Sequence, residues 1–282
     1  MTPRCAAIHD LSGFGRCSLT IILPVLSAMG VQCCPLPTAY LSTHTGGFTG
    51  NTFLDMTAAL ADAARHWETL GLTFQAVYTG FMASPEQLAL AGEVVAWMKG
   101  RGALAVIDPV MGDHGRPYRT YTPSMCAAAA ELAALGDVIT PNLTEAALLL
   151  GLDRLPEDHF DQVAARLSLD GRRSVVLTGA VRRAGEAGAV CYDRETGETT
   201  FVGLRRAEGE FHGTGDLFTS VLTGALLQGK GLAEGAWMAA GFVRDCVERT
   251  ARLGTPAREG LDFEPLLGRL CGGSALDGYR GI

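Results

Sequence analysis

The sequence predicts an α/β protein built on a mostly parallel sheet, and two observations carry that prediction. Short apolar segments recur along the chain, and each ends in a polar residue followed by a turn and a helical pattern. Uninterrupted apolar segments suit strands that are buried on both faces, as they are in parallel sheets. Glycine is also abundant, with 36 of 282 residues and no collagen period. This abundance fits a chain with many tight turns between strands and helices.

The first half of the chain alternates strands with helices. We expect a first strand at 5–8, then a helix at 18–29 that has apolar residues at helical spacing and bends at Pro24. Another helix begins after Ser84, a capping residue followed by proline at the first helical position, and ends before Gly100. The other strands of this alternation are expected at 74–77, 104–107, 137–139 and 174–177.

The last third of the chain has a different pattern. Residues 183–210 are typical of a hairpin, with strands at 188–192 and 199–202 around a polar turn. The chain after residue 216 is mainly helical in pattern. No linker, repeat or shift in composition separates these parts, so we expect one domain that spans residues 1–282.

Composition and charge exclude several classes of protein. Hydrophobic residues make up 48% of the chain and charged residues 19%, which excludes a disordered protein. The net charge is −7 and no run of basic residues occurs, so we expect no nucleic-acid partner. The two lysines, Lys99 and Lys230, lie outside any Gly-Lys-Ser/Thr phosphate loop, and the eight cysteines lack metal-binding spacing.

The sequence also predicts the compartment. The first residues lack the apolar stretch of a secretory signal, and the longest apolar segment, 19–29, is interrupted by Pro24 and too short to span a bilayer. Eight cysteines without a pairing pattern suit a reducing compartment, where thiols stay free. We therefore expect a cytoplasmic protein with no membrane partner.

Polar residues follow the predicted strands, and they predict the location of a site. In an open parallel sheet, ligands bind outside the carboxyl ends of the strands. The polar residues at these ends are Asp10, Thr79, Asp108, Thr140 and Thr178. The alternative interpretation is that strands need a polar residue where they leave the core, whatever the function.

The segment 212–218, His-Gly-Thr-Gly-Asp-Leu-Phe, is the strongest candidate for chemistry. It precedes a helix, and the unpaired amides of the first helical turn attract an anion, helped by the helix dipole. The positive helix end should keep Asp216 ionised, so that it can accept a proton from a substrate hydroxyl. The alternative is a glycine turn followed by an ordinary first-turn acid.

Two other acidic segments could hold a cation. Asn142 and Glu145 precede an apolar helix and have the spacing of a capping box, but they could also hold Mg²⁺ through water. Asp108 and Asp113 lie on one loop after a strand, where carboxylates near a phosphate suffice for Mg²⁺. Solvated loop acids are the alternative for this pair.

Two glycine-containing loops complete the candidates. Residues 12–18 imitate a dinucleotide-binding turn, but Ser18 replaces the third glycine and no acid follows before Asp55, which argues against a nicotinamide enzyme. The loop at 44–50 could cover a substrate or could be an ordinary surface loop.

The chain resembles the pyridoxal kinases (pyridoxine/pyridoxamine kinases) of the ribokinase-like superfamily. The segments that carry the resemblance span nearly the whole chain and are 7–15, 42–46, 78–81, 107–113, 139–145 and 213–218. The last is typical of the superfamily, and Thr-His-Thr-Gly at 43–46 combined with the acidic segment at 108–113 is typical of vitamin kinases. The resemblance implies a ribokinase-like three-layer α/β sandwich, with a mostly parallel central sheet flanked by helices on both faces.

The resemblance also implies an activity. It implies phosphoryl transfer from ATP to the 5′-hydroxymethyl group of pyridoxal, pyridoxamine or pyridoxine. ATP is then a co-substrate and Mg²⁺ a cofactor, a monovalent cation is allowed as a further cofactor, and a homodimer is expected. The alternatives are a hydroxymethylpyrimidine or sugar kinase on the same fold, and a non-catalytic carrier of a vitamer or nucleotide.

Roles follow for individual positions that match the family motifs. Asp216 matches the catalytic base, and the anion hole corresponds to Gly213, Thr214 and Gly215. Nucleotide and metal are expected near Asp108, Asp113, Thr140, Asn142, Glu145 and Thr178, with Asp113 and Glu145 nearest the metal. The substrate is expected to contact Asp10, Ser12, Thr45, Phe81 and Asp216.

Three positions depart from the commonest pyridoxal kinases. Asp10 stands where many have serine, and an acid there could pair with a protonated ring nitrogen or prefer an amino-bearing ring. Phe81 stands where relatives often have tyrosine. The histidine at position 212 is similar to the one found there in the hydroxymethylpyrimidine kinases, although those enzymes usually carry cysteine where this chain has Asp216.

Overall fold

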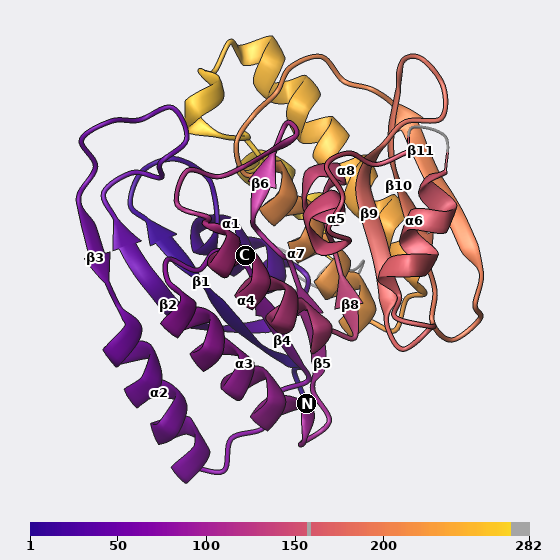
Figure 1. Ribbon diagram of the computed structural model, residues 1–282. Helices are drawn as coiled ribbons and strands as arrows, with labels where there is room; N and C mark the ends of the chain where they lie inside the picture. Colours follow the sequence, from indigo (N-terminus) through magenta and orange to yellow (C-terminus); the bar gives the residue numbers. More distant parts are fainter. Residues whose placement is uncertain (157–158, 272–282) are drawn as a thin grey trace, which may run out of the picture.

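The computed structural model describes residues 1–156 and 159–271, and its framework is one long mixed sheet (Figure 1). Nine strands of the described chain lie in the order β11-β10-β9-β8-β5-β4-β1-β2-β3. Their bounds are β1 Arg4–Ser12, β2 Gln32–Leu41, β3 Phe53–Asp55, β4 Ala76–Thr79, β5 Leu104–Ile107, β8 Val138–Ile139, β9 Ser174–Ala180, β10 Glu186–Tyr192 and β11 Thr199–Arg205. A separate two-stranded ribbon joins β6 (Gly112–Asp113) to β7 (Arg116–Pro117).

The centre of the sheet is parallel, as predicted. Strands β9, β8, β5, β4, β1 and β2 pair in parallel along the sheet. The predicted hairpin at 183–210 is also confirmed, because β10 and β11 pair antiparallel with each other and β10 pairs antiparallel with β9. At the other edge, the short strand β3 pairs antiparallel with β2.

Helices cover both faces of the sheet, which gives three layers. One apolar core joins the sheet to the helices α2 (Thr57–Thr69), α3 (Pro85–Lys99), α4 (Pro123–Ala134), α5 (Leu143–Leu149) and α6 (Phe160–Leu167). A second core joins the opposite face to α1 (Leu19–Ala28), α7 (Thr214–Leu227) and α8 (Leu232–Leu253). Two short 3₁₀ turns, η1 (Ala257–Glu259) and η2 (Glu264–Arg269), follow α8. Figure 1 shows α2, α3 and α4 side by side over one face.

Local sequence signals explain where several helices begin. The Ser84 hydroxyl accepts a hydrogen bond from the Gln87 amide, and Pro85 occupies the first turn of α3, so this helix starts and ends as predicted. The Thr122 side chain caps α4 in the same way, again with a proline at its first turn. Within the described residues, no helix combines the length and the apolar character that crossing a bilayer requires.

The polar residues predicted at strand ends do not all lie at ends. Thr79 is the last residue of β4, and Asp108 and Thr140 directly follow β5 and β8. Asp10 instead lies inside β1, beside an irregularity in its pairing with β2, and Thr178 lies inside β9. Both strands are longer than their apolar segments because backbone pairing continues past the last apolar residue.

Candidate active site

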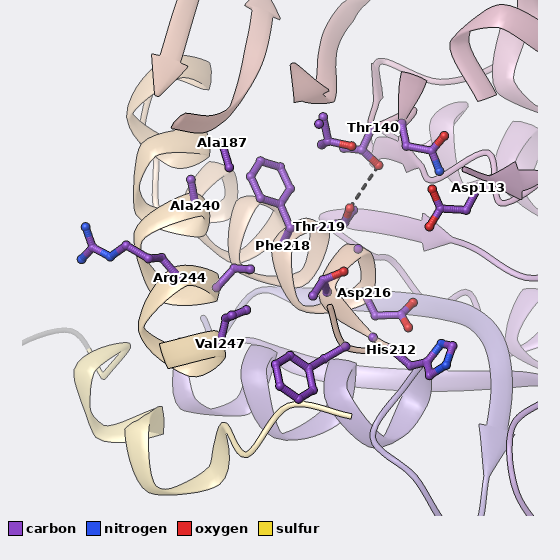
Figure 2. Close-up of a pocket in the computed structure, with 18 of the residues that line it drawn as sticks. Asp113, Thr140, Ala187, His212, Asp216, Phe218, Thr219, Ala240, Arg244 and Val247 are labelled. Carbon is purple, nitrogen blue, oxygen red and sulfur yellow. Dashed lines mark hydrogen bonds between the residues drawn. The ribbon is translucent and has the colours of Figure 1, made fainter. Parts of the chain in front are cut away.

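A cavity of about 480 Å³ opens at the carboxyl edge of the sheet, beside the start of α7 (Figure 2). All of the residues predicted to handle nucleotide, metal and phosphoryl transfer line it, although they come from four separate segments of the chain. These lining residues are Asp108, Asp113, Thr140, Asn142, Glu145, Thr178, Gly213, Thr214, Gly215 and Asp216. The structure therefore brings these residues together around one cavity.

The start of α7 presents open amides to the cavity. Gly213 precedes the helix with a φ angle of 79°, and a side chain there would collide with the carbonyl oxygen of Arg16. Within the described chain, the first-turn amides of Thr214, Gly215 and Asp216 have no hydrogen-bond acceptor. Such amides bind anions, and the helix dipole adds to the attraction. The cavity thus has a binding place for a phosphoryl group.

Asp216 stands in this first turn with its side chain partly buried. Its Oδ2 atom accepts a hydrogen bond of 2.8 Å from the main-chain N–H of Ser18. Burial raises the pKa of Asp216 to about 7, against the opposing effect of that hydrogen bond. A pKa of about 7 leaves Asp216 partly ionised near neutral pH, because the loss of solvent opposes the favourable effect expected of the helix end. A base that titrates near neutral pH is well matched to accepting a proton.

Asn142 and Glu145 form the capping box that was one of the two alternatives left open by the sequence. They form a reciprocal cap, in which Asn142 Oδ1 accepts from the Glu145 amide and Glu145 Oε2 accepts from the Asn142 amide, each at 2.9 Å. Glu145 Oε1 also accepts from the Met111 amide at 3.2 Å. Burial raises the pKa of Glu145 to about 8, and repulsion by Asp113 contributes. The cap holds a buried carboxylate at the cavity wall.

Asp108 and Asp113 differ in their surroundings. Asp108 is 8% exposed. Its pKa is raised well above the ordinary value, mainly by burial and also by repulsion from Glu145 and Asp216. Asp113 lies on β6 with its side chain half-exposed, and its Oδ1 atom accepts a hydrogen bond from the His114 amide. The prediction of solvated loop acids thus fits Asp113 and not Asp108.

The acidic residues fit a hard cation that is shared with a phosphate. Burial and mutual repulsion destabilise the anionic forms of Asp108 and Glu145, and a divalent cation would relieve that repulsion. No group of three or more His, Cys, Asp or Glu in residues 1–156 and 159–271 forms a complete metal site. Mg²⁺ tolerates this, because it retains waters and shares its ligands with substrate phosphates.

Two threonines complete the polar wall. The Thr219 hydroxyl on α7 donates to the Thr140 hydroxyl at 3.1 Å, which ties the end of β8 to α7 (Figure 2). The Thr178 hydroxyl donates to the carbonyl oxygen of Pro141 at 3.3 Å. Thr140 is therefore fixed against α7, and Thr178 is fixed against the segment that follows β8.

The other wall of the cavity is mostly apolar but also carries Arg205, Arg206 and Arg244. The sequence did not identify this wall. Figure 2 shows Phe218, Ala240 and Val247 on the side opposite Asp113 and Thr140. This wall combines the β10–β11 hairpin with α7 and α8, and its residues include Ala187, Leu204, Phe218, Ala240, Val243 and Val247. Ordinary apolar residues form no sequence motif that would indicate a ligand site. Only the packing of α8 against β11 brings them together.

The residues predicted to contact the substrate ring do not line this cavity. Asp10 is 5% exposed, and its carboxylate accepts hydrogen bonds from Ser12 Oγ at 3.0 Å and Ser18 Oγ at 2.6 Å. Thr45 is exposed on a loop, and Phe81 is partly buried against the core. These four residues lie on the β1, β2 and β4 side of the sheet, whereas the cavity extends toward β9–β11.

The loop at 44–50 packs against the start of α7. His44 Nδ1 accepts from the Gly46 amide at 3.1 Å, so its other ring nitrogen, Nε2, carries the proton and donates to the Arg258 carbonyl oxygen at 2.7 Å. The His44 ring also lies 5.0 Å from that of His212, centroid to centroid. His44 is buried, whereas the other residues of the loop are partly or fully exposed, as the surface-loop interpretation expects.

Comparisons with known proteins agree on one family. The sequence profile of the family described as phosphomethylpyrimidine kinase matches residues 23–259. The chain is 33% identical to the pyridoxine/pyridoxal/pyridoxamine kinase of Bordetella bronchiseptica over 86% of this chain and 87% of that protein. Among solved structures, a candidate phosphomethylpyrimidine kinase from Bacteroides thetaiotaomicron, crystallised with pyridoxal, is 35% identical with a TM-score of 0.86 and 96% coverage of both chains. Pyridoxal kinase from Lactobacillus plantarum is 31% identical, with a TM-score of 0.88 and coverage of 96% of this chain and 97% of that one.

Proposed function

The chain belongs to the phosphomethylpyrimidine kinase family, is an ATP-dependent small-molecule kinase of ribokinase-like fold, and is related to pyridoxal kinases; from that premise we propose its acceptor. The proposed reaction transfers the γ-phosphoryl group of ATP to the 5′-hydroxymethyl group of pyridoxal, pyridoxamine or pyridoxine. One observation supports it above all others, namely that the partly buried Asp216 carboxylate stands in the same helical turn as three open amides.

In the proposed reaction, each of these groups has one task. The Asp216 carboxylate accepts the proton of the vitamer hydroxyl as its oxygen bonds to the γ-phosphorus, while the bond from that phosphorus to ADP breaks. The amides of Thr214, Gly215 and Asp216 bind the oxygens of the transferring group. Phosphoryl transfer depends mainly on positioning and charge stabilisation, and one preorganised donor contributes about a hundred- to a thousand-fold in rate.

ATP would occupy the cavity from its apolar wall to the start of α7. The apolar side chains around Ala240 suit the flat face of a purine, and Thr140 and Thr178 lie toward the phosphates. Asp108, Asp113 and Glu145 are the residues that would hold Mg²⁺, directly or through water. When bound, Mg²⁺ neutralises charge on the phosphate oxygens.

The vitamer would lie on the other side of Asp216. We propose that its ring contacts Asp10, Ser12, Thr45 and Phe81. Asp10 is joined to Asp216 through Ser18, and the loop that carries Thr45 packs on His212, which supports a substrate site adjoining the start of α7. We further propose that the protein is a cytoplasmic homodimer. Light scattering tests the dimer, which should have twice the 29.7 kDa mass of the chain.

A second acceptor is favoured by two observations. The family is described by a pyrimidine substrate, and His212 precedes Gly213 as in the hydroxymethylpyrimidine kinases that the segment resembles. Hydroxymethylpyrimidine also presents a hydroxymethyl group on a nitrogen heterocycle, so the same Asp216 chemistry applies.

A panel of acceptors tests the proposal. ADP formation should be measured with ATP and each of pyridoxal, pyridoxamine, pyridoxine, hydroxymethylpyrimidine and ribose. The proposal expects the highest kcat/KM for a B6 vitamer. A higher value for hydroxymethylpyrimidine or ribose would replace the acceptor, and binding without turnover of any compound would identify a carrier.

A further inference from the structure

Ser18 has a backbone conformation that serine rarely adopts. Its φ angle is 49°, on the positive side of the map where non-glycine residues are uncommon. It occupies the N-cap position of α1, where a serine hydroxyl usually accepts a hydrogen bond from the first helical turn, but no such bond exists within the described chain. An unfavourable conformation that the surrounding structure maintains is a pointer to function.

The contacts of Ser18 join two parts of the site. Its hydroxyl donates to Asp10 Oδ1 at 2.6 Å, and its main-chain N–H donates to Asp216 Oδ2 at 2.8 Å. Ser18 is 6% exposed, so water competes little for either bond. One residue therefore connects β1 with the first turn of α7.

The Ser18 amide is important because the rest of the surroundings disfavour an ionised Asp216. In residues 1–156 and 159–271, no other hydrogen-bond donor contacts the Asp216 carboxylate, and no cationic side chain forms an ion pair with it. Burial is the main cause that raises the pKa of Asp216, and repulsion from Asp10 acts in the same direction. Asp108, Cys17, Tyr78 and Tyr118 also interact with Asp216, but the thiol and the two phenols are uncharged near neutral pH because their own pKa values are raised. The Ser18 amide opposes both burial and Asp10.

The loop that delivers this amide is held from several directions. The Gly13 amide donates to the Leu41 carbonyl oxygen at 2.7 Å, and the Arg16 amide donates to the Glu259 carbonyl oxygen at 3.1 Å. The main chain of Arg16 lies so close to Gly213 that a side chain at position 213 would not fit. The position of the Ser18 amide is therefore set by the fold on both sides.

We propose that Ser18 is a positioning residue for phosphoryl transfer, in which the hydroxyl anchored on Asp10 holds the main-chain N–H against Asp216 and thereby keeps that carboxylate ionised and oriented. Its kinetic consequence rests on the proposed function, because only a kinase that uses Asp216 as a base would lose turnover. The effect on Asp216 itself does not depend on the acceptor. The two can therefore be tested separately.

The direct test is the titration of Asp216. The protein is labelled with ¹³Cγ-aspartate, and the Asp216 signal is assigned by its absence from Asp216→Asn. The midpoint should lie near pH 7 in the unmodified protein. In Ser18→Ala it should rise by about one to two pH units, as expected for losing one hydrogen bond to a charged group. An unchanged midpoint would overturn the proposal.

Two further variants serve as a second test and as a control. Ser18→Gly accepts a φ angle of 49° without strain and lacks only the hydroxyl anchor, so it should fold and raise the midpoint less than alanine does. If Ser18→Ala does not fold, an unchanged midpoint in Ser18→Gly overturns the proposal. Ser84→Ala is the matched control, because it removes an N-cap serine of α3, far from Asp216 in the chain. It should lower the melting temperature and leave the midpoint unchanged.

Kinetics separate this inference from the proposed function. With a B6 vitamer, Ser18→Ala should lose about tenfold in kcat at pH 7 and recover most of it above pH 9, with little change in KM. A loss of equal size at every pH would indicate a purely structural role and would contradict the proposal. A protein whose Asp216 midpoint responds as expected but which phosphorylates no acceptor would instead refute the proposed function.

Discussion

Asn142 and Glu145 cap each other, since each side chain accepts a 2.9 Å hydrogen bond from the main-chain amide of the other. The same pair lines the cavity of the candidate active site. A common helix-capping motif therefore fixes a buried carboxylate beside the place where phosphates are expected. Structural and functional interpretations of this motif are compatible, because the cap uses the lone pairs that face the helix end and the side chains still border the cavity.

The buried Glu145 should make stability depend on pH. Its pKa is raised from 4.5 to about 8, so the folded state retains a proton that the unfolded chain releases. In the absence of nucleotide and metal, the free energy of unfolding should therefore fall as pH rises from 4.5 to 8.

Glu145→Gln keeps an acceptor for the Asn142 amide, loses the acceptor for the Met111 amide, and should remove this dependence, with a slope shallower by about 1.4 kcal/mol per pH unit at most. Urea unfolding at a series of pH values measures this slope for both proteins. Equal slopes in the two proteins would show that Glu145 does not titrate as described.

Gly213 should be sensitive to substitution for two separable reasons. Gly213→Ala combines a φ angle of 79° with a collision against the Arg16 carbonyl oxygen. Gly229→Ala is its matched control, because Gly229 has a φ angle of 81° and open space around it. The control should lose about 1–2 kcal/mol of stability from the backbone conformation alone.

The additional loss of stability in Gly213→Ala measures the cost of the collision with the Arg16 carbonyl oxygen. The turnover of Gly213→Ala should also fall, because the anion-binding amides move. Chemical denaturation and initial rates provide both numbers. Equal stability of the two variants would mean that the Arg16 segment can move aside freely.

The apolar wall should determine affinity for ATP and not for the acceptor. Ala240→Leu places extra volume in that wall, and overpacking of about 1–3 kcal/mol would raise the KM for ATP about five- to 150-fold. The KM for the vitamer should stay unchanged. Ala251→Leu, at an exposed position of the same helix, controls for the substitution itself. A rise in the vitamer KM alone would assign this wall to the acceptor.

Local patterns were sufficient to predict much of the fold. Apolar segments identified the parallel strands, and Ser84 followed by proline identified the start of α3. Strand β2 was not predicted, because Pro35 and Pro37 interrupt its pattern and proline cannot donate to a strand ladder. The structure tolerates both, since β3 pairs only with residues 39–41 and leaves the prolines beyond its reach.

The candidate site was predictable wherever one segment carried its chemistry. The glycine-flanked Asp216 and the Asn142–Glu145 cap are of this kind. The bond between Ser18 and Asp216 was not, because the residues lie 198 positions apart and only the packing of α1 against α7 joins them. The burial of Asp216 also depends on packing between distant segments, so its raised pKa could not be predicted from the sequence.

The most direct test of Asp216 as the base is the rate of ADP formation with saturating ATP and pyridoxal, measured against pH for the unmodified protein and for Asp216→Asn. The account predicts a rate that rises through pH 7 as Asp216 ionises. It predicts for Asp216→Asn a rate about 10²–10⁴-fold lower with no such rise, while calorimetry still detects binding of both ligands. Near-normal turnover by Asp216→Asn would contradict it.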